Sequence, residues 1–348
     1  MFPRNQWYVI AWGRDIGPAP YSRMVCGEPI LVYRCSDGTI AAMRDACPHR
    51  LLPLSMGIKE GDKIRCRYHG LLIDRHGRAA EMPIKGDPVN RSICAPRYPV
   101  VERYGFVWVW IGEAERSDPA LLPDFWMCED PGWVFDGGTY HVRCNYQLLV
   151  DNLMDLTHET YVHEGSIGQP ELMDVPITTR TDGDRVVVER WMADVPPAPA
   201  YRTSDRQGNV DRWQVCYFLP PTSVVIDVGV APVDQGATLA NHPVRSFVID
   251  AMTPETETST WYYWGAARNF DIDDSERTER TKSVQAKVFA EDIAVLEAQQ
   301  RSIEANPDLK LQAFNIDAGG VRSRLLIRRL ARSGLATDHQ NAALVPAR

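Results

Sequence analysis

The sequence lacks several features that would indicate particular classes of protein. Lys and Arg number 38 against 46 Asp and Glu, a net charge of −8, so the chain has no basic excess to attract nucleic acids or anionic membranes. No apolar run approaches the roughly 18 residues of a membrane-spanning helix. The N-terminal "MFPRNQWYVIAWGRD" has neither the basic region nor the cleavage site of a signal peptide. These absences predict a cytoplasmic protein that binds neither nucleic acid nor membrane.

The chain also has no G-x-G-x-x-G fingerprint, so it has no recognisable flavin or nicotinamide site of its own. It does contain 8 cysteines. A cytoplasmic setting disfavours disulfides, so cysteines with a special spacing indicate metal ligands instead.

The character of the sequence changes near residue 115. Before it, short β-prone runs such as "PILVYR" and "GFVWVWIG" alternate with turns. The segment "EAERSDPALLPDF" is charged and contains prolines, as is typical of a linker. Beyond it, strands such as "RVVVERWMA" mix with long helices, the clearest from Glu279 to Ala305. We therefore expect two domains, residues 1–115 and 116–348.

The first of these domains contains the pattern C-x-H…C-x-x-H. Cys47 and His49 form one half, and Cys66 and His69 form the other, each within a short turn between candidate strands. Two thiolates and two imidazoles suit either a structural zinc ion or a Rieske [2Fe–2S] cluster, in which one iron takes two Cys and the other two His. A zinc finger pairs like with like, whereas each half here supplies one of each ligand. The cluster is favoured, with zinc and a coincidence of turn residues as the alternatives.

A second histidine pair follows in "NLMDLTHETYVHEG". His158 and His163 are five residues apart, which on a continuous helix separates them by about 140°. They can therefore share a metal only if the helix ends or distorts between them. Asp155 lies three residues before His158, and Asn152 one turn earlier, so on a helix these residues would share a face. Polar residues at a helix start are the alternative reading of Asn152 and Asp155.

Taken in this order, the two patterns resemble the Rieske non-heme iron aromatic-ring oxygenases, in their oxygenase (alpha) component. "RYPVVERYGFVWVWIG" and "MTPETETSTWYYW" resemble one branch of that family. This branch includes the vanillate O-demethylase, dicamba O-demethylase and toluenesulfonate methyl-monooxygenase oxygenases. Relatives in this branch often have His where this chain has Trp261, and some have another near Asp250.

The resemblance implies a role for each ligand type. The residues expected to hold the Rieske cluster are Cys47, His49, Cys66 and His69. His158 and His163 are expected to bind a mononuclear Fe(II), and Asp155 to bridge an iron-bound His to a Rieske His, with Asn152 on the same face.

The third iron ligand is expected from the long downstream helix. Its apolar stripe is marked by Val284, Val288, Val295, Leu296 and Ile303. Asp292 falls within this stripe, and because a buried unpaired carboxylate is costly, a cation explains it. The resemblance also identifies the "EDIAVLEAQQ" segment as the source of this ligand. Glu291 is the alternative ligand, and capping or a salt bridge is the alternative role.

The implied fold is α+β: an all-β N-terminal Rieske domain and a C-terminal antiparallel-sheet, helix-grip catalytic domain. The implied activity is NADH- and O2-dependent monooxygenation of an aromatic compound, foremost O-demethylation of a methoxy-aromatic acid such as vanillate. Methyl hydroxylation, N-demethylation, ring dihydroxylation or a role as electron carrier only are the alternatives. Electrons are expected from NADH through a separate flavin/iron–sulfur reductase. The resemblance also implies a homotrimer.

Overall fold

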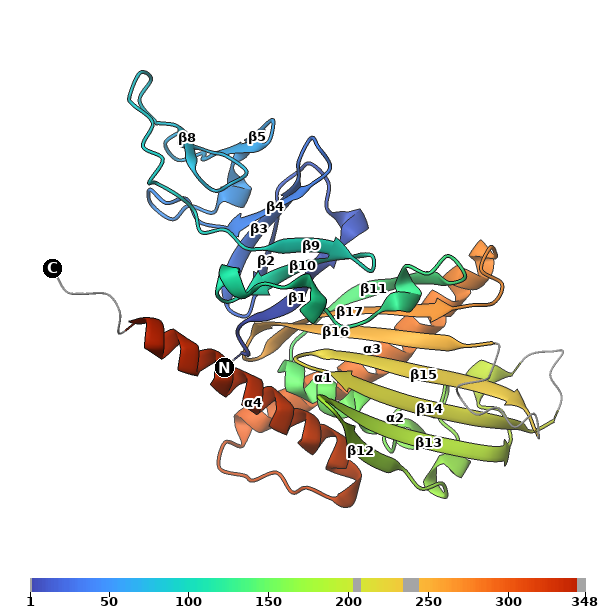
Figure 1. Cartoon of the computed structure of the whole chain (residues 1–348). Helices are drawn as coiled ribbons and strands as arrows, with labels where there is room; N and C mark the ends of the chain where they lie inside the picture. The colour runs from blue at the N-terminus through green and yellow to red at the C-terminus, as the bar shows by residue number, and fades with distance from the viewer. Residues whose placement is uncertain (1, 203–207, 234–243, 343–348) are drawn as a thin grey trace. The chain divides into compact units, whose positions relative to one another are not determined.

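The computed structural model describes residues 2–202, 208–233 and 244–342. The chain divides into two compact units (Figure 1). One comprises Phe2–Leu122 with Thr253–Thr256, and the other comprises the remaining described residues. Each unit has its own sheets.

The first unit contains three small antiparallel sheets, ordered β1-β10-β9, β2-β3-β4 and β5-β6-β7-β8. Their strands are β1 (Gln6–Trp12), β2 (Tyr21–Val25), β3 (Glu28–Arg34), β4 (Ile40–Arg44), β5 (Ile58–Glu60), β6 (Lys63–Arg65), β7 (Leu72–Ile73), β8 (Ala79–Glu81), β9 (Val100–Arg103) and β10 (Phe106–Ile111). Every residue of β10 is buried, as expected for a run of aromatic and β-branched residues. The predicted all-β character of this part of the chain is confirmed.

The second unit is built on one seven-stranded antiparallel sheet, in the order β11-β17-β16-β15-β14-β13-β12. Its strands are β11 (Val134–Val142), β12 (Thr178–Asp182), β13 (Arg185–Val195), β14 (Val210–Leu219), β15 (Ser223–Pro232), β16 (Ser246–Thr256) and β17 (Ser259–Arg268). Its helices are α1 (Tyr146–Leu153), α2 (Glu159–Val162), α3 (Ser275–Ala305) and α4 (Ala318–Ala342). The antiparallel sheet with helices confirms the predicted α+β fold.

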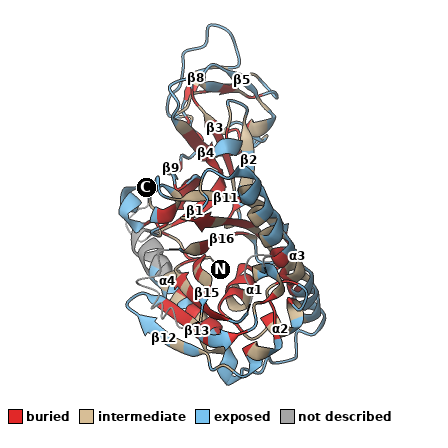
Figure 2. Cartoon of the chain, turned by 90° about the vertical axis from the view of Figure 1, so that its right-hand side faces the viewer, coloured by how far each residue is buried: buried red, intermediate tan, exposed pale blue. Residues whose placement is uncertain are grey.

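Helix α3 begins four residues before the predicted start. Asp274 is its N-cap, and the Asp274 side chain accepts a hydrogen bond from the Arg277 backbone N–H, which satisfies a donor that the first turn leaves free. One side of α3 is buried and the other is exposed (Figure 2). The buried residues are Val288, Phe289, Asp292, Leu296 and Gln300.

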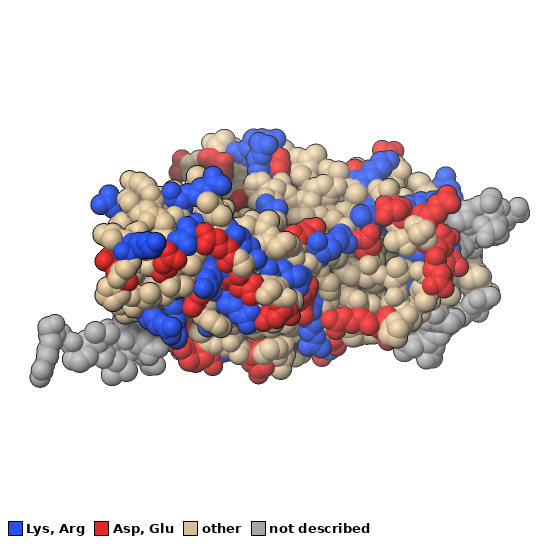
Figure 3. Space-filling model, turned by 90° about the horizontal axis from the view of Figure 1, so that it is seen from above, with Lys and Arg blue, Asp and Glu red and all other residues tan. Residues whose placement is uncertain are grey.

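The described helices include none with an apolar stretch long enough to cross a membrane. Acidic and basic side chains lie next to one another over much of the face shown in Figure 3. This mixture agrees with the modest negative net charge of the sequence.

Candidate metal centres

Two loops of the first unit carry the C-x-H and C-x-x-H patterns, and they are closed in the same way. The Cys47 N–H donates to Leu52 O and Leu51 N–H donates back to Cys47 O, both at 2.8 Å. In the second loop, Cys66 N–H donates to Leu71 O and Gly70 N–H donates to Cys66 O, at 2.9 and 3.0 Å. Each loop therefore closes over the same number of residues, from the cysteine to the fifth residue after it. The histidine follows the cysteine by two residues in the first loop and by three in the second.

This turn requires a left-handed backbone at the fourth residue after each cysteine. Gly70 has φ of 80° and Leu51 has φ of 59°. Glycine adopts this conformation without strain, whereas leucine does so at a cost. The geometry of the loop is thus imposed in spite of the local preference at Leu51.

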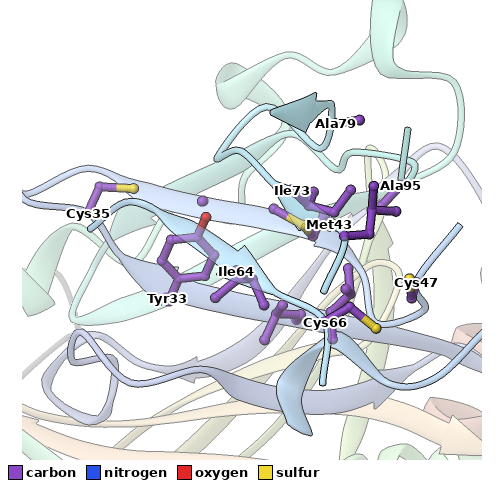
Figure 4. Packing of buried hydrophobic residues seen from close by; sticks show 13 residues of the cluster. Tyr33, Cys35, Met43, Cys47, Ile64, Cys66, Ile73, Ala79 and Ala95 are labelled. Atoms are coloured by element: carbon purple, nitrogen blue, oxygen red, sulfur yellow. The ribbon is translucent and has the colours of Figure 1, made fainter. Parts of the chain in front are cut away.

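The four candidate ligands are separated by type. Cys47 and Cys66 are only 2% and 3% exposed, and they lie next to each other at one end of a buried cluster (Figure 4). His49 and His69 are exposed, with ring centroids 4.5 Å apart. Buried thiols and exposed imidazoles fit a cluster in which one iron is bound by Cys and the other by His.

The second histidine pair lies at a break in the helix. Helix α1 ends at Leu153, and α2 is a single turn with His158 as its N-cap and His163 as its C-cap. The prediction that Asp155 and His158 share a helical face is therefore wrong, because Asp155 lies between the two helices. The break instead brings the two imidazole rings together, with centroids 5.1 Å apart.

Asp292 of α3 completes this group. Its Oδ1 lies 3.4 Å from Nε2 of His158 and 3.2 Å from Nε2 of His163. One candidate ligand atom from each of the three residues lies within 4.8 Å of the others. Two imidazoles and one carboxylate on one side of a metal position are the ligand set of non-heme Fe(II) oxygenases, so the residues fit such an ion.

Burial and charge act in opposite directions on this triad. Burial alone would lower the pKa of both histidines, but the Asp292 carboxylate raises the pKa of each. Burial would likewise raise the pKa of Asp292, yet its contacts with His158 and His163 lower it to about 2. Asp292 is therefore held as a carboxylate, the form that binds a metal.

Glu291 contacts the outer side of the same group. Its Oε2 lies 2.8 Å from Nδ1 of His163, the ring nitrogen that does not face Asp292, and accepts a hydrogen bond from Ser166 Oγ at 2.9 Å. Glu291 thus stands in the position of a residue that orients a metal-bound histidine, a common arrangement at metal sites.

Asn152 and Asp155 lie beside the triad in different ways. Asn152 Nδ2 donates to Asp292 Oδ1 at 3.0 Å. Asp155 contacts His158 through its main-chain carbonyl, 2.7 Å from Nδ1. The Asp155 side chain instead accepts from the backbone N–H and hydroxyl of Thr157, at 2.7 and 2.6 Å, and both bonds go to Oδ1.

A pocket adjoins the triad. Its apolar lining consists of Leu153, Leu156, Ile167, Cys216, Ile226, Val228, Val248, Val288 and Phe289. Its polar lining consists of Asn152, Asp155, His158, Glu159, His163, Tyr201, Gln214, Gln285 and Asp292. Neither Trp261 nor Asp250 is among these residues. Half of the lining residues are apolar, and the polar half includes the three candidate ligands, as expected of a small-molecule site beside a metal.

Glu159 and Gln214 are pocket residues that the sequence reasoning missed. With Arg190 and Arg212 they form a buried polar group, each member at most 3% exposed. The sequence does contain a sign of this group: three polar residues lie within strands whose other residues are mostly hydrophobic, namely Arg190, Arg212 and Gln214. Charged residues are almost never fully buried unless they are paired.

Comparison with known proteins assigns both centres to families. The Rieske [2Fe-2S] domain family matches residues 6–99, which include both cysteine–histidine loops. The vanillate O-demethylase oxygenase C-terminal domain matches residues 142–333, which include the whole triad. A Rieske domain followed by such a domain defines a Rieske oxygenase.

The full-length relatives narrow this class. The chain is 46% identical to a vanillate O-demethylase oxygenase subunit from Pseudomonas sp., with 99% of each chain covered. Its fold matches a crystal structure of dicamba monooxygenase bound to 3,6-dichlorosalicylic acid, with a TM-score of 0.90, 33% identity and coverage of 96% and 98%. A structure of dicamba monooxygenase with non-heme iron and dicamba matches with a TM-score of 0.82, 32% identity and the same coverage.

The chain therefore belongs to the vanillate O-demethylase oxygenase family, and the predicted family is confirmed. It is an enzyme, the oxygenase component of a system that also requires a reductase. The alternative of an electron carrier alone, which would account for the Rieske domain only, is set aside.

Proposed function

We propose that the chain demethylates a methoxy-aromatic acid such as vanillate, with electrons from NADH supplied through a separate reductase. The balanced reaction is ArOCH3 + O2 + NADH + H+ → ArOH + HCHO + H2O + NAD+. The observation that carries this proposal is the full-length identity of 46% to a vanillate O-demethylase oxygenase subunit. Oxygen enters a methyl C–H bond, and the resulting hemiacetal collapses to a phenol and formaldehyde.

In this proposal, residues 1–115 form the cluster-binding domain and residues 116–348 the catalytic domain. The cluster is held by Cys47, His49, Cys66 and His69, and the mononuclear iron by His158, His163 and Asp292. When bound, the cluster supplies one-electron transfer and the iron supplies the activation of O2. The separation of buried thiols from exposed imidazoles supports the first assignment, and the 4.8 Å grouping of ligand atoms supports the second.

The neighbouring side chains orient these ligands. Asn152 donates to Asp292 Oδ1 and limits rotation of that carboxylate. Glu291 accepts from Nδ1 of His163 and so leaves the lone pair of Nε2 for a metal. The Asp155 carbonyl does the same for His158. The Asp155 carboxylate, whose two described hydrogen bonds both go to Oδ1, is proposed to bridge to a Rieske histidine.

The test is turnover by purified, metal-loaded protein with a surrogate reductase, NADH, O2 and vanillate. We expect formaldehyde and 3,4-dihydroxybenzoate in equal amounts, with one NADH consumed for each. Ring-hydroxylated or dihydrodiol products without formaldehyde would replace demethylation with the hydroxylation or dihydroxylation alternatives. Absence of any product from vanillate and related methoxybenzoates would overturn the proposed substrate class.

The proposal extends to the assembly, the partner and the cell compartment. We propose a homotrimer located in the cytoplasm, served by a flavin/iron–sulfur reductase; the resemblance to the family supports this. Light scattering should give three copies of the 39.3 kDa chain. A monomer that is fully active would contradict the trimer, and recovery of the native protein in the membrane or periplasmic fraction would contradict the compartment.

A further inference from the structure

Glu159 places a buried carboxylate at the wall of the substrate pocket. It follows His158 directly in the sequence, is 3% exposed, and is one of the lining residues together with Gln214. The two side chains touch, because Gln214 Nε2 donates to Glu159 Oε1 at 2.6 Å. Glu159 therefore lies in the wall of the same pocket as the triad that is proposed to bind iron.

Two fully buried arginines hold this carboxylate in place. Arg212 Nη2 donates to Glu159 Oε2 at 3.1 Å, and Arg190 Nη2 lies 3.4 Å from the same oxygen. Arg212 is itself fixed by Ile167 O and Gln169 Oε1, at 2.9 and 2.8 Å. Both guanidinium groups face the same carboxylate, whose oxygens act as hydrogen-bond acceptors.

The described contacts leave one acceptor position on Glu159 unused. A carboxylate oxygen accepts about two hydrogen bonds, and among the described residues only Gln214 donates to Oε1. The described lining residues include no Lys or Arg. A substrate group that contacts Oε1 of Glu159 must therefore donate a hydrogen bond.

We infer that Glu159 is a specificity-determining residue, which accepts a hydrogen bond from a hydroxyl group on the substrate ring. This inference rests on the proposed function and narrows its substrate class to methoxy-arenes with a free phenolic hydroxyl. Arg190, Arg212 and Gln214 act through Glu159 by fixing its position.

A purely structural role for Glu159 gives a different expectation. If the carboxylate only neutralised Arg190 and Arg212, its loss would weaken folding but would change the affinity for all methoxybenzoates equally. A role in recognition changes only the affinity for compounds with the hydroxyl. The two roles are separated by comparing matched compounds, and total activity does not separate them.

The first experiment uses the unaltered, metal-loaded enzyme and three probes: vanillate, 3-methoxybenzoate and 3,4-dimethoxybenzoate. Dissociation constants are measured by calorimetry without O2 or reductase, so that the result does not depend on turnover. Hydrogen bonds to charged groups predict that vanillate binds at least about tenfold more tightly than either compound without the hydroxyl. Equal affinities would overturn the inference but not the proposed function, whereas failure of all three to bind would overturn the proposed function itself.

The second experiment compares Glu159→Gln with Glu164→Gln, which alters an exposed carboxylate nearby. Glu159→Gln should reduce the preference for vanillate over 3-methoxybenzoate to about one- to threefold, with the dissociation constant of 3-methoxybenzoate almost unchanged. Glu164→Gln should keep the full preference. An unchanged preference in folded Glu159→Gln would contradict the inference. If that variant does not fold, the comparison of the three probes on the unaltered enzyme decides the question.

Discussion

Replacing Glu291 by Gln tests how the metal triad is oriented. In the native chain the Glu291 carboxylate lies 2.8 Å from Nδ1 of His163 and 2.9 Å from Ser166 Oγ. Glutamine has nearly the same shape and still offers one oxygen, but it carries no charge. The hydrogen bond to Nδ1 would persist in a weaker form, so His163 should keep its orientation but become a poorer donor to a metal at Nε2.

The size of the effect follows from this change in charge. Charge-assisted hydrogen bonds are roughly twice as strong as neutral ones, and loss of an outer partner of a metal-bound histidine typically costs about 10- to 100-fold in metal affinity. We therefore expect Fe(II) to bind Glu291→Gln about tenfold more weakly, or about 1.4 kcal/mol. Asp292→Ala removes a ligand outright and should lose the mononuclear iron and activity.

The assay is competition with an Fe(II) chelator under anaerobic conditions, with the Rieske absorption spectrum as an internal reference. That spectrum should be unchanged, because the cluster residues lie in the other compact unit. Glu279→Gln is the matched control, since the Glu279 side chain on the same helix is 70% exposed. Unaltered iron affinity in Glu291→Gln would refute the orienting role. If Asp292→Ala kept its iron and its turnover while Glu291→Gln lost both, Glu291 would be the third ligand.

The fully loaded protein should contain two cluster irons and one mononuclear iron per chain, with a Rieske-type EPR signal on reduction; stoichiometric zinc without labile sulfide would contradict this. Asp155→Asn should keep both metal centres but nearly abolish turnover. Mixed oligomers of His69→Ala and His158→Ala chains should regain part of the activity that each variant lacks alone, because an intact cluster in one chain can supply an intact iron site in its neighbour. Mixed oligomers that are verified by mass and remain inactive would refute transfer between subunits. Burial raises the pKa of Asp250 to about 8, whereas an Asp in the unfolded chain has a pKa near 3.9. Between about pH 4 and pH 8 the folded chain therefore keeps a proton on Asp250 that the unfolded chain has lost. The free energy of unfolding falls as the pH rises through this range. Asp250→Asn should remove this loss, so its melting temperature relative to the unaltered protein should increase from pH 5 to pH 8, and a difference independent of pH would refute the reasoning.

The spacing of residues in the sequence pointed to the candidate histidine and cysteine ligands. It did not predict the backbone conformation that brings them together. The spacing of His158 and His163 excluded a shared face on a continuous helix, and the structure resolves this with a helix break. The same break invalidates the shared face expected for Asp155 and His158. The local signal for this break is the side-chain turn that Asp155 forms with Thr157, which competes with the helix and was not recognised from the spacing of the polar residues.

The buried face of the long helix was predicted only in part. Asp292, Val288 and Leu296 are buried as expected, but Val284 and Val295 are 41% and 48% exposed. The actual buried face also includes Gln300, whose Oε1 accepts from the Asn145 backbone N–H. Hydrophobicity alone does not show which side of a helix meets the sheet when a buried polar residue has a partner far away in sequence.

The group around Glu159 could not be assembled from the sequence for the same reason. Arg212 lies 53 residues from Glu159, and the two strands that supply Arg190 and Gln214 are paired in the sheet. Burial of these charges is favourable only after the strands and the α2 turn have come together. The pairing is therefore a property of the folded unit and not of any local segment.

Because His163 and Asp292 are far apart in sequence, a metal bound between them would also affect the stability of the fold. An ion bound by both would cross-link two segments separated by 128 intervening residues. It would stabilise only the folded chain, by a free energy that rises with the logarithm of its concentration relative to the dissociation constant. The histidine side of this cross-link is the single turn α2, too short to persist as an isolated helix. Iron supply should therefore govern how long the enzyme survives as well as how fast it works, because without iron this segment would open first and be the first cut by proteases.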